Sequence, residues 1–83
     1  MLNEKNNKMK LEKFIKDFAE QFDDTDASEI IADTNFLELE EWSSLMVLSV
    51  IAMIKTEYGK TVTGTEIRNC DTVEQLFNVV SSK

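Results

Sequence analysis

The chain has 83 residues, 16 of them acidic and nine basic, with no histidine, no proline and one cysteine. A chain of this length forms one small domain and is too short to enclose a substrate cleft between two layers of sheet. The absence of histidine excludes Ser-His and Cys-His nucleophile activation and histidine metal ligands. The single cysteine, Cys70, excludes an internal disulfide, and we expect it to be a buried, inert thiol after a short helix.

The charge is unevenly distributed along the chain. Residues 1–16 carry a net charge of +3, so residues 17–83 carry −10 of the total of −7. An acidic body repels nucleic acid and anionic membranes and attracts basic patches on proteins, although acids also simply keep a small protein in solution. No stretch reaches the roughly 18 apolar residues of a membrane span, and the first residues lack the apolar core of a secretory signal. We expect a cytoplasmic monomer that binds no nucleic acid and has no membrane span.

The supply of residues favours helices throughout, which predicts an all-α fold. Residues 1–7 are polar and show no period, so we expect a flexible leader, followed by a single helical domain over residues 8–83. The first helix is predicted from about Met9 to Phe22. Its apolar residues recur at helical spacing, at Leu11, Phe14, Ile15, Phe18 and Phe22.

Residues 23–43 form a long connection, which in a compact domain is usually functional or held by its own side chains. A short helical turn is predicted around residues 28–32. Six apolar residues are expected to anchor the connection to the core: Ile30, Ile31, Phe36, Leu37, Leu39 and Trp42. The acids from Asp23 onward suggest a calcium loop, but counted from Asp24 the sixth position is Glu29 and the twelfth is Asn35, where glycine and glutamate are required. We predict no metal site.

The central helix is predicted to begin at a pair of serines. Ser43 is suited to the N-cap, which makes Ser44 the first helical residue, exposed at the positive end of the helix dipole, where a phosphate is favoured. Gly59 is expected to end the helix after Tyr58 in the left-handed conformation. The predicted core stripe of this helix is Val47, Ile51, Ile54 and Tyr58.

Two further helices follow. Thr63 and Glu66 stand at the spacing of a capping box and predict a short helix. Asp71, with Glu74 three residues on, is predicted to cap a last helix that ends near Ser81. The predicted fold is a small four-helix bundle with three longer helices, one short helix and a long first loop.

The segment Trp42-Ser43-Ser44-Leu45 resembles the Trp-Asp-Ser-Leu motif of the acyl carrier proteins, in the phosphopantetheine-binding superfamily. Residues 62–67 and 71–77 are similar in spacing to the third and fourth helices of that family. The resemblance implies an acidic four-helix bundle in which the serine opening the second helix carries a covalent 4′-phosphopantetheine. That serine corresponds to Ser44, because Leu45 follows it and Trp42 stands two residues before it.

The resemblance also implies a function without catalytic residues. The arm would hold an acyl or aminoacyl group as a thioester and shuttle it between enzymes of fatty-acid, lipid or polyketide-like biosynthesis. Its partners would be a phosphopantetheinyl transferase and acyl-loading and acyl-using synthases or transferases. Ser43 stands where the family usually has an aspartate. In the family that aspartate is expected to assist docking of the transferase that loads the arm. Two alternatives stay open, namely a carrier-like bundle that is never loaded and a helical adaptor in which Ser43 and Ser44 only cap the helix.

The outer face of the central helix is predicted to dock these enzymes. Its apolar side chains lie beside Ser44, and methionine thioethers adapt to differently shaped surfaces. The family's recognition helix usually bears several acids, whereas Met46 and Ser49 occupy such positions here. The predicted docking residues are Ser43, Leu45, Met46, Ser49, Met53, Glu40 and Glu41. The alternative is that Met46 and Met53 are ordinary core residues.

Overall fold

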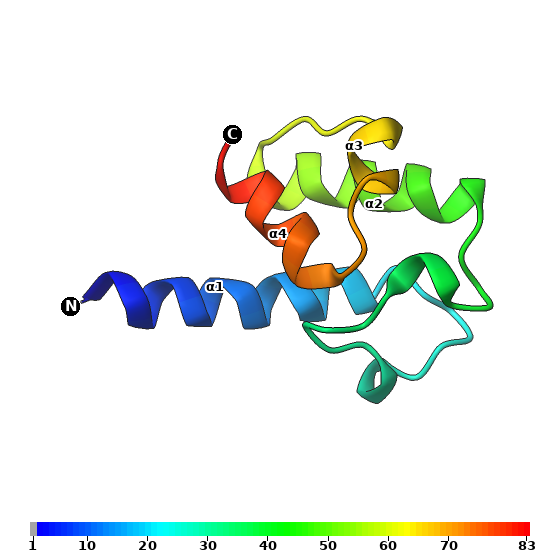
Figure 1. Ribbon diagram of the computed structural model, residues 1–83, viewed down its shortest axis with the longest axis horizontal. Coiled ribbons are helices and arrows are strands. Elements are labelled where there is room, and N and C mark those ends of the chain that lie inside the picture. Colours follow the sequence, from blue (N-terminus) through cyan, green and yellow to red (C-terminus); the bar gives the residue numbers. More distant parts are fainter. Residues whose placement is uncertain (1) are drawn as a thin grey trace.

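A computed structural model describes the backbone of residues 2–83 and the side chains of residues 10–83. Its elements, in chain order, are α1 (Leu2–Ala19), the 3₁₀ turns η1 (Ala27–Glu29) and η2 (Phe36–Glu38), α2 (Ser44–Tyr58), α3 (Gly64–Arg68) and α4 (Val73–Ser81). Residues 2–83 contain no strand. The predicted all-α bundle, with three longer helices, one short helix and a long first loop, is confirmed (Figure 1).

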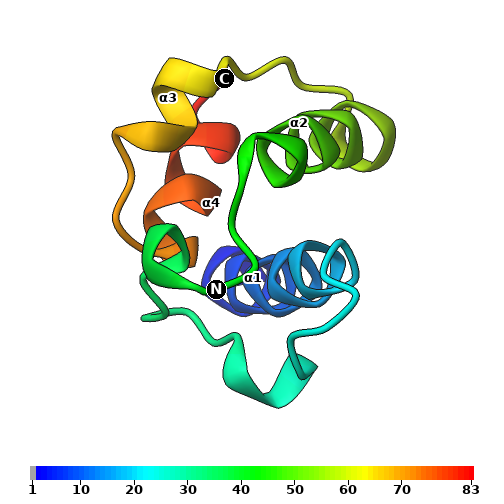
Figure 2. The same ribbon diagram turned by 90° about the vertical axis from the view of Figure 1, so that its right-hand side faces the viewer.

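The helices pack in pairs around one core. α1 packs against both α2 and α4, and α2 packs against α3. α1 and α2 run in opposite directions, and α4 crosses beside them (Figure 1). Turned by 90°, the molecule shows α3 and α4 on one side and α2 on the other, with the long loop beneath them (Figure 2). This arrangement leaves one face of α2 without a neighbouring helix.

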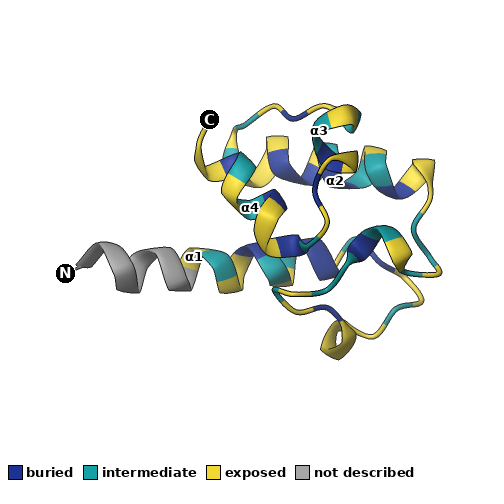
Figure 3. Ribbon diagram, viewed as in Figure 1, coloured by how far each residue is buried: buried dark blue, intermediate teal, exposed yellow. Residues whose placement is uncertain are grey.

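The core is built from aromatic and aliphatic side chains of all four helices. Phe14 and Phe18 of α1, Ile54 of α2, Ile67 of α3 and Leu76 of α4 are completely buried. The buried positions lie on the inward faces of the helices (Figure 3). No buried polar or charged side chain occurs in residues 10–83. Burial of apolar surface therefore provides the main driving force for folding.

The ends of α1 differ from the prediction. The helix ends at Ala19 instead of Phe22, because the chain tightens there through 3₁₀-type bonds, with the Phe22 N–H donating to the Ala19 carbonyl over 3.1 Å. Phe22 remains buried although it lies beyond the helix. α1 begins at Leu2, earlier than the predicted start near Met9. The leader predicted for residues 1–7 stays a prediction, because Met1 and the side chains of residues 2–9 lie outside the described part.

The long connection is held against the bundle, as predicted. The Val73 N–H donates to the Thr34 carbonyl over 3.2 Å, which ties the loop to the start of α4. Ile30 and Phe36 are buried anchors. The predicted turn appears as η1, which begins at Ala27. The prediction that Ile31 is an anchor is wrong, since its side chain is 58% exposed and its neighbour Ile30 takes the inward position.

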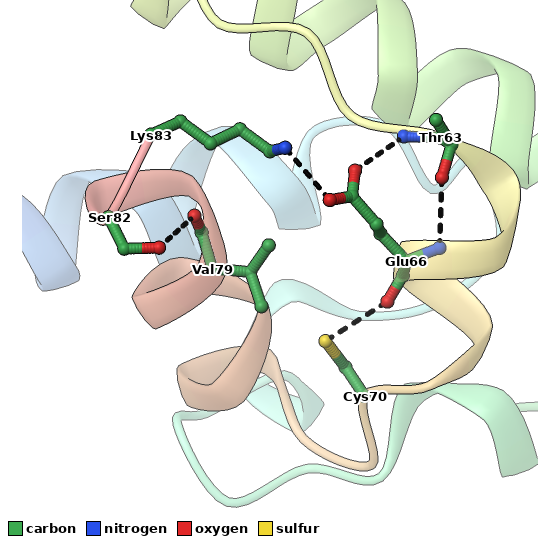
Figure 4. Close-up of polar contacts among 6 residues, drawn as sticks. All are labelled: Thr63, Glu66, Cys70, Val79, Ser82 and Lys83. Carbon is green, nitrogen blue, oxygen red and sulfur yellow. Dashed lines mark hydrogen bonds and ion pairs between the residues drawn. The ribbon is translucent and has the colours of Figure 1, made fainter.

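The ends of α2 and α3 are set by local signals in the predicted way. Gly59 adopts the left-handed conformation with a φ of 67° and caps α2, its N–H donating to the Lys55 carbonyl. Thr63 and Glu66 form the capping box of α3, through two bonds of 3.0 and 3.1 Å between side chain and backbone (Figure 4). The Glu66 carboxylate also accepts from Lys83 Nζ over 2.8 Å, and this bond is the main reason that the pKa of Glu66 is lowered.

The start of α4 lies one residue later than predicted. The N-cap is Thr72, whose hydroxyl accepts from the Gln75 N–H over 3.2 Å, while the Asp71 N–H donates to the Gln75 side chain over 2.7 Å. A threonine competes well with a neighbouring aspartate for this position, because both side chains can cap. The helix ends at Ser81, as predicted.

Candidate functional site

The start of α2 has the predicted geometry. Ser43 is the N-cap, in extended backbone conformation, and its Oγ accepts from the Met46 N–H over 3.4 Å. The Val47 N–H donates to the Ser43 carbonyl over 3.1 Å and closes the first helical turn. Ser44 is the first helical residue and is exposed. The Ser44 hydroxyl is therefore accessible from solvent at the positive end of a fifteen-residue helix.

The electrostatic setting of Ser44 favours a negative group. The first turn of α2 contains no acidic side chain, so no carboxylate of that turn competes for its backbone N–H groups. The unpaired N–H groups and the helix dipole act together on an anion placed at this end. A phosphodiester on Ser44 would lie where both effects stabilise it.

Trp42, two residues before Ser44, is held in place by an aromatic cluster. Trp42 lies edge-on to Phe36, with ring centroids 4.9 Å apart, and stacks against Phe18 and Phe22 at 6.3 Å each. Its backbone N–H donates to the Leu39 carbonyl over 3.0 Å. Offset and edge-to-face aromatic pairs of this kind stabilise a fold beyond their area of contact. The path of the chain into Ser43 and Ser44 is thus set from the core of the bundle.

Glu41 holds the same segment to a distant part of the loop. Its carboxylate accepts from the N–H groups of Asp23 and Asp24, over 2.8 and 3.1 Å, and from Thr25 Oγ1 over 2.8 Å. Loss of hydration raises the pKa of Glu41, but the three bonds outweigh it and leave the pKa below its ordinary value. Glu41 was predicted to dock partners, and in the structure its carboxylate orders the loop. Its neighbour Glu40 is exposed.

The predicted docking face of α2 needs correction. Leu45 is 74% exposed, as expected, and Ser49 is partly exposed. The side chains of Met46 and Met53, however, are only 7% and 5% exposed, so the prediction that they lie on an exposed docking face is wrong. Both belong to the hydrophobic core, together with Val50, because the buried stripe of α2 is rotated from the predicted one toward these residues.

Leu48 is an exposed residue that the sequence prediction did not include. Its side chain is 62% exposed and lies one helical turn after Leu45. The spacing of three residues from Leu45 was the available signal. Val47, Ile51 and Tyr58, predicted as core, are partly buried and pack against it.

The other reactive side chains of the chain lie in inert surroundings. Cys70 is buried, its Sγ–H donates to the Glu66 carbonyl over 3.3 Å, and burial raises the pKa of its thiol (Figure 4). The Tyr58 hydroxyl donates to Asp17 over 2.9 Å, and burial together with that bond raises the pKa of Tyr58.

The described residues offer no metal site: in residues 10–83, no group of three or more cysteine, aspartate and glutamate side chains lies close enough together to hold a metal ion. Within the described chain, no helix has the length and apolar character needed to cross a membrane.

Comparison with known proteins identifies the family. A family model described as the phosphopantetheine attachment site matches residues 13–80, which include the C-terminal part of α1, all of α2 and α3, and nearly all of α4. No curated protein and no solved structure matched the chain. Members of the matching family bind a covalently attached 4′-phosphopantetheine. Because the match covers well over half of its length, the chain belongs to the family of phosphopantetheine-binding carrier domains.

Proposed function

We propose that Ser44 is the residue of this carrier domain to which 4′-phosphopantetheine is attached. The observation that carries the proposal is the position of Ser44 as the exposed first residue of α2, inside the segment that matches the family. When bound, the arm supplies a thiol that holds an acyl or aminoacyl group as a thioester. The domain then acts as a handle that presents this group to other enzymes.

The residues around Ser44 fit the attached group. Ser43 satisfies the Met46 N–H, while the other N–H groups of the first turn remain available to a phosphodiester. The Trp42 cluster and the Glu41 bonds hold the approach to the helix, so that Ser44 is presented at a defined point of the surface. The chain contains no histidine, and the first turn of α2 contains no acidic side chain, so we propose that the base that removes the hydroxyl proton of Ser44 comes from the loading enzyme.

The cargo and the pathway are part of the proposal. We place the domain in fatty-acid, lipid or polyketide-like biosynthesis, where a phosphopantetheinyl transferase loads it and acyl-loading and acyl-using enzymes act on it. The acidic composition supports partners with basic surfaces. Ser43 supports one alternative, a carrier-like bundle that acts unloaded through protein contacts, because it lacks the negative charge usual at this position of the motif.

Intact-protein mass spectrometry tests the proposal directly. The protein is incubated with coenzyme A and a phosphopantetheinyl transferase of broad specificity, and we expect a gain of one phosphopantetheine per chain. Ser44→Ala should abolish the gain. Ser43→Ala is the matched control, because it removes only a cap worth about 1 kcal/mol and should at most slow the reaction. Loading that survives in Ser44→Ala would refute the assignment, and a wild-type chain that gains no mass would favour the unloaded alternative.

A further inference from the structure

A groove opens at the opposite end of α2 from Ser44. It lies where the middle of α1 passes the ends of α2 and α4, and its volume is about 510 Å³. Tyr58, which lines the groove, is the last residue of α2, so the groove and Ser44 are separated by the length of that helix, roughly 20 Å (Figure 1). Sites for small molecules usually have volumes of about 300–1,000 Å³. The groove therefore has room for a ligand that makes no contact with Ser44.

The more buried part of the groove lining is apolar. It consists of the half-buried rings of Tyr58 and Phe77 and of Val80, which is only 3% exposed. Both rings pack against Phe14 in the core, with ring centroids 5.6 Å apart in each pair. Lys13 Nζ lies 5.1 Å from the centre of the Tyr58 ring, which places a positive charge at the border of the apolar surface. The core thus holds a preformed apolar surface open to a ligand.

The more exposed part of the lining carries positive charge. Among the described residues that line the groove, Lys10, Lys13 and Lys60 are basic and Glu57 is acidic. Lys13 is paired with Asp17 over 2.7 Å and with Glu57 over 3.5 Å, so these two carboxylates are already neutralised. Within residues 10–83, neither Lys10 nor Lys60 forms an ion pair with a carboxylate side chain. Two ammonium groups at the groove are therefore available to an anion.

Most of the negative charge of the chain lies away from the groove. Residues 17–54 contain ten acidic and no basic side chains, which are spread over the last turn of α1 and the long loop. The loop lies at the end of the molecule where α2 begins (Figure 1). At about 0.1 M salt the Debye length is about 10 Å, so exposed charges at that end are largely screened from the groove. An anion in the groove interacts mainly with the lysines around it.

We propose that this groove binds an organic carboxylate with an apolar body. Lys10 and Lys60 hold its charged end, and Tyr58, Phe77 and Val80 contact its body. Charge complementarity selects an anion over a cation of the same shape, and the apolar lining selects an anion with an apolar body over a small ion. The site is non-covalent and separate from the proposed function, because it does not depend on attachment of the arm to Ser44.

An NMR titration of the full chain, without the arm, tests the proposal. The ¹⁵N-labelled protein is titrated with decanoate below the concentration at which decanoate forms micelles. We expect saturable shifts of the amides of Tyr58, Phe77 and Val80 and little change at Ser44. Two matched probes are decyltrimethylammonium, with the same chain and opposite charge, and acetate, with the same charge and no chain; neither should saturate these amides. The Kd should fall about fourfold from octanoate to decanoate, because the two added methylenes become partly buried.

Substitutions of the lysines test the charged contact. Lys10→Gln should raise the Kd for decanoate about threefold, as expected for the loss of one exposed ion pair. Lys60→Gln should act in the same direction, but Lys60 also donates to the Lys83 carbonyl over 2.5 Å, so the Lys10 variant isolates the effect of charge more cleanly. Lys55→Gln is the matched control, because Lys55 is an exposed lysine of α2 outside the groove. Its Kd should equal that of the wild type.

Each contrary outcome overturns the proposal in a recognisable way. Equal binding of decyltrimethylammonium would show that the groove does not select anions, and saturation by acetate would show that no apolar body is needed. Decanoate shifts that are absent, or confined to the start of α2, would remove the ligand from the groove. Equal Kd values for Lys10→Gln, Lys55→Gln and the wild type would remove the lysines from the site. None of these results bears on Ser44, whose loading is measured separately by mass.

Discussion

Adjacent residues at the start of α2 should differ sharply in their contribution to stability. Met46 is 7% exposed and belongs to the hydrophobic core, whereas Leu45 is 74% exposed. Replacing a buried methionine by alanine removes apolar contacts and leaves a cavity, which typically costs 2–5 kcal/mol. We expect a loss of about 3 kcal/mol for Met46→Ala, near the middle of that range. Leu45→Ala should change the free energy of unfolding by less than about 0.5 kcal/mol, because leucine and alanine are both good helix formers and the Leu45 side chain is mostly exposed.

Urea unfolding followed by fluorescence measures both values. Trp42 is the only tryptophan and packs into the aromatic cluster, so its emission reports loss of the core. The slope of free energy against urea should be the same for both variants, which would show that only stability has changed. In a thermal melt, about 3 kcal/mol corresponds to a fall in Tm of roughly 12–24 °C for a domain of this size.

A second pair of variants, at Met53 and Leu48 of the same helix, tests whether the difference between Met46 and Leu45 is only a local effect at the first turn of α2. Met53 is 5% exposed and Leu48 is 62% exposed, so Met53→Ala should lose about as much stability as Met46→Ala, while Leu48→Ala should lose almost none. If both methionine variants were as stable as both leucine variants, the burial of α2 described here would be wrong. The methionines would then return to the docking face predicted from the sequence.

Three further results are expected. Glu41→Gln should lower Tm and speed hydrogen exchange in residues 23–25, because it weakens the bonds that hold the loop. Folding lowers the pKa of Glu41, so the stability that its carboxylate contributes is present above its ordinary pKa and is lost as the pH falls through the lower folded value. The difference in Tm between Glu41→Gln and the wild type should therefore vanish in acid. Tyr58→Phe removes the bond to Asp17 and should cost about 1 kcal/mol in urea unfolding, and a loss near zero would show that the bond contributes nothing. Added salt should raise Tm by screening the ten acids of residues 17–54, and a Tm unchanged between low and high salt would argue against self-repulsion.

The ends of the helices after the long loop could be predicted closely from the sequence. Ser43, Gly59 and the pair of Thr63 and Glu66 cap their helices as expected. Such signals are readable because a cap is formed within about four residues of the chain, so the interaction needs no knowledge of the rest of the fold. At α4 two neighbouring residues could both cap, and here the prediction chose Asp71 where Thr72 is used. The position of Ser44 at the start of α2 follows from the same local chemistry and could be predicted with the motif around it.

The buried face of α2 was decided only by the tertiary structure. This helix is apolar on nearly all sides, so two overlapping stripes have helical spacing, one through Val47 and Ile51 and one through Met46 and Val50. Which stripe is buried depends on where α1 and α3 lie against the helix, and the sequence of α2 holds no information on that. Glu41 is a similar case, since its partners lie 16–18 residues earlier in the chain and only the folded loop brings them together. The exposed pair of Leu45 and Leu48 lies on the part of α2 that the packing of the other helices leaves uncovered.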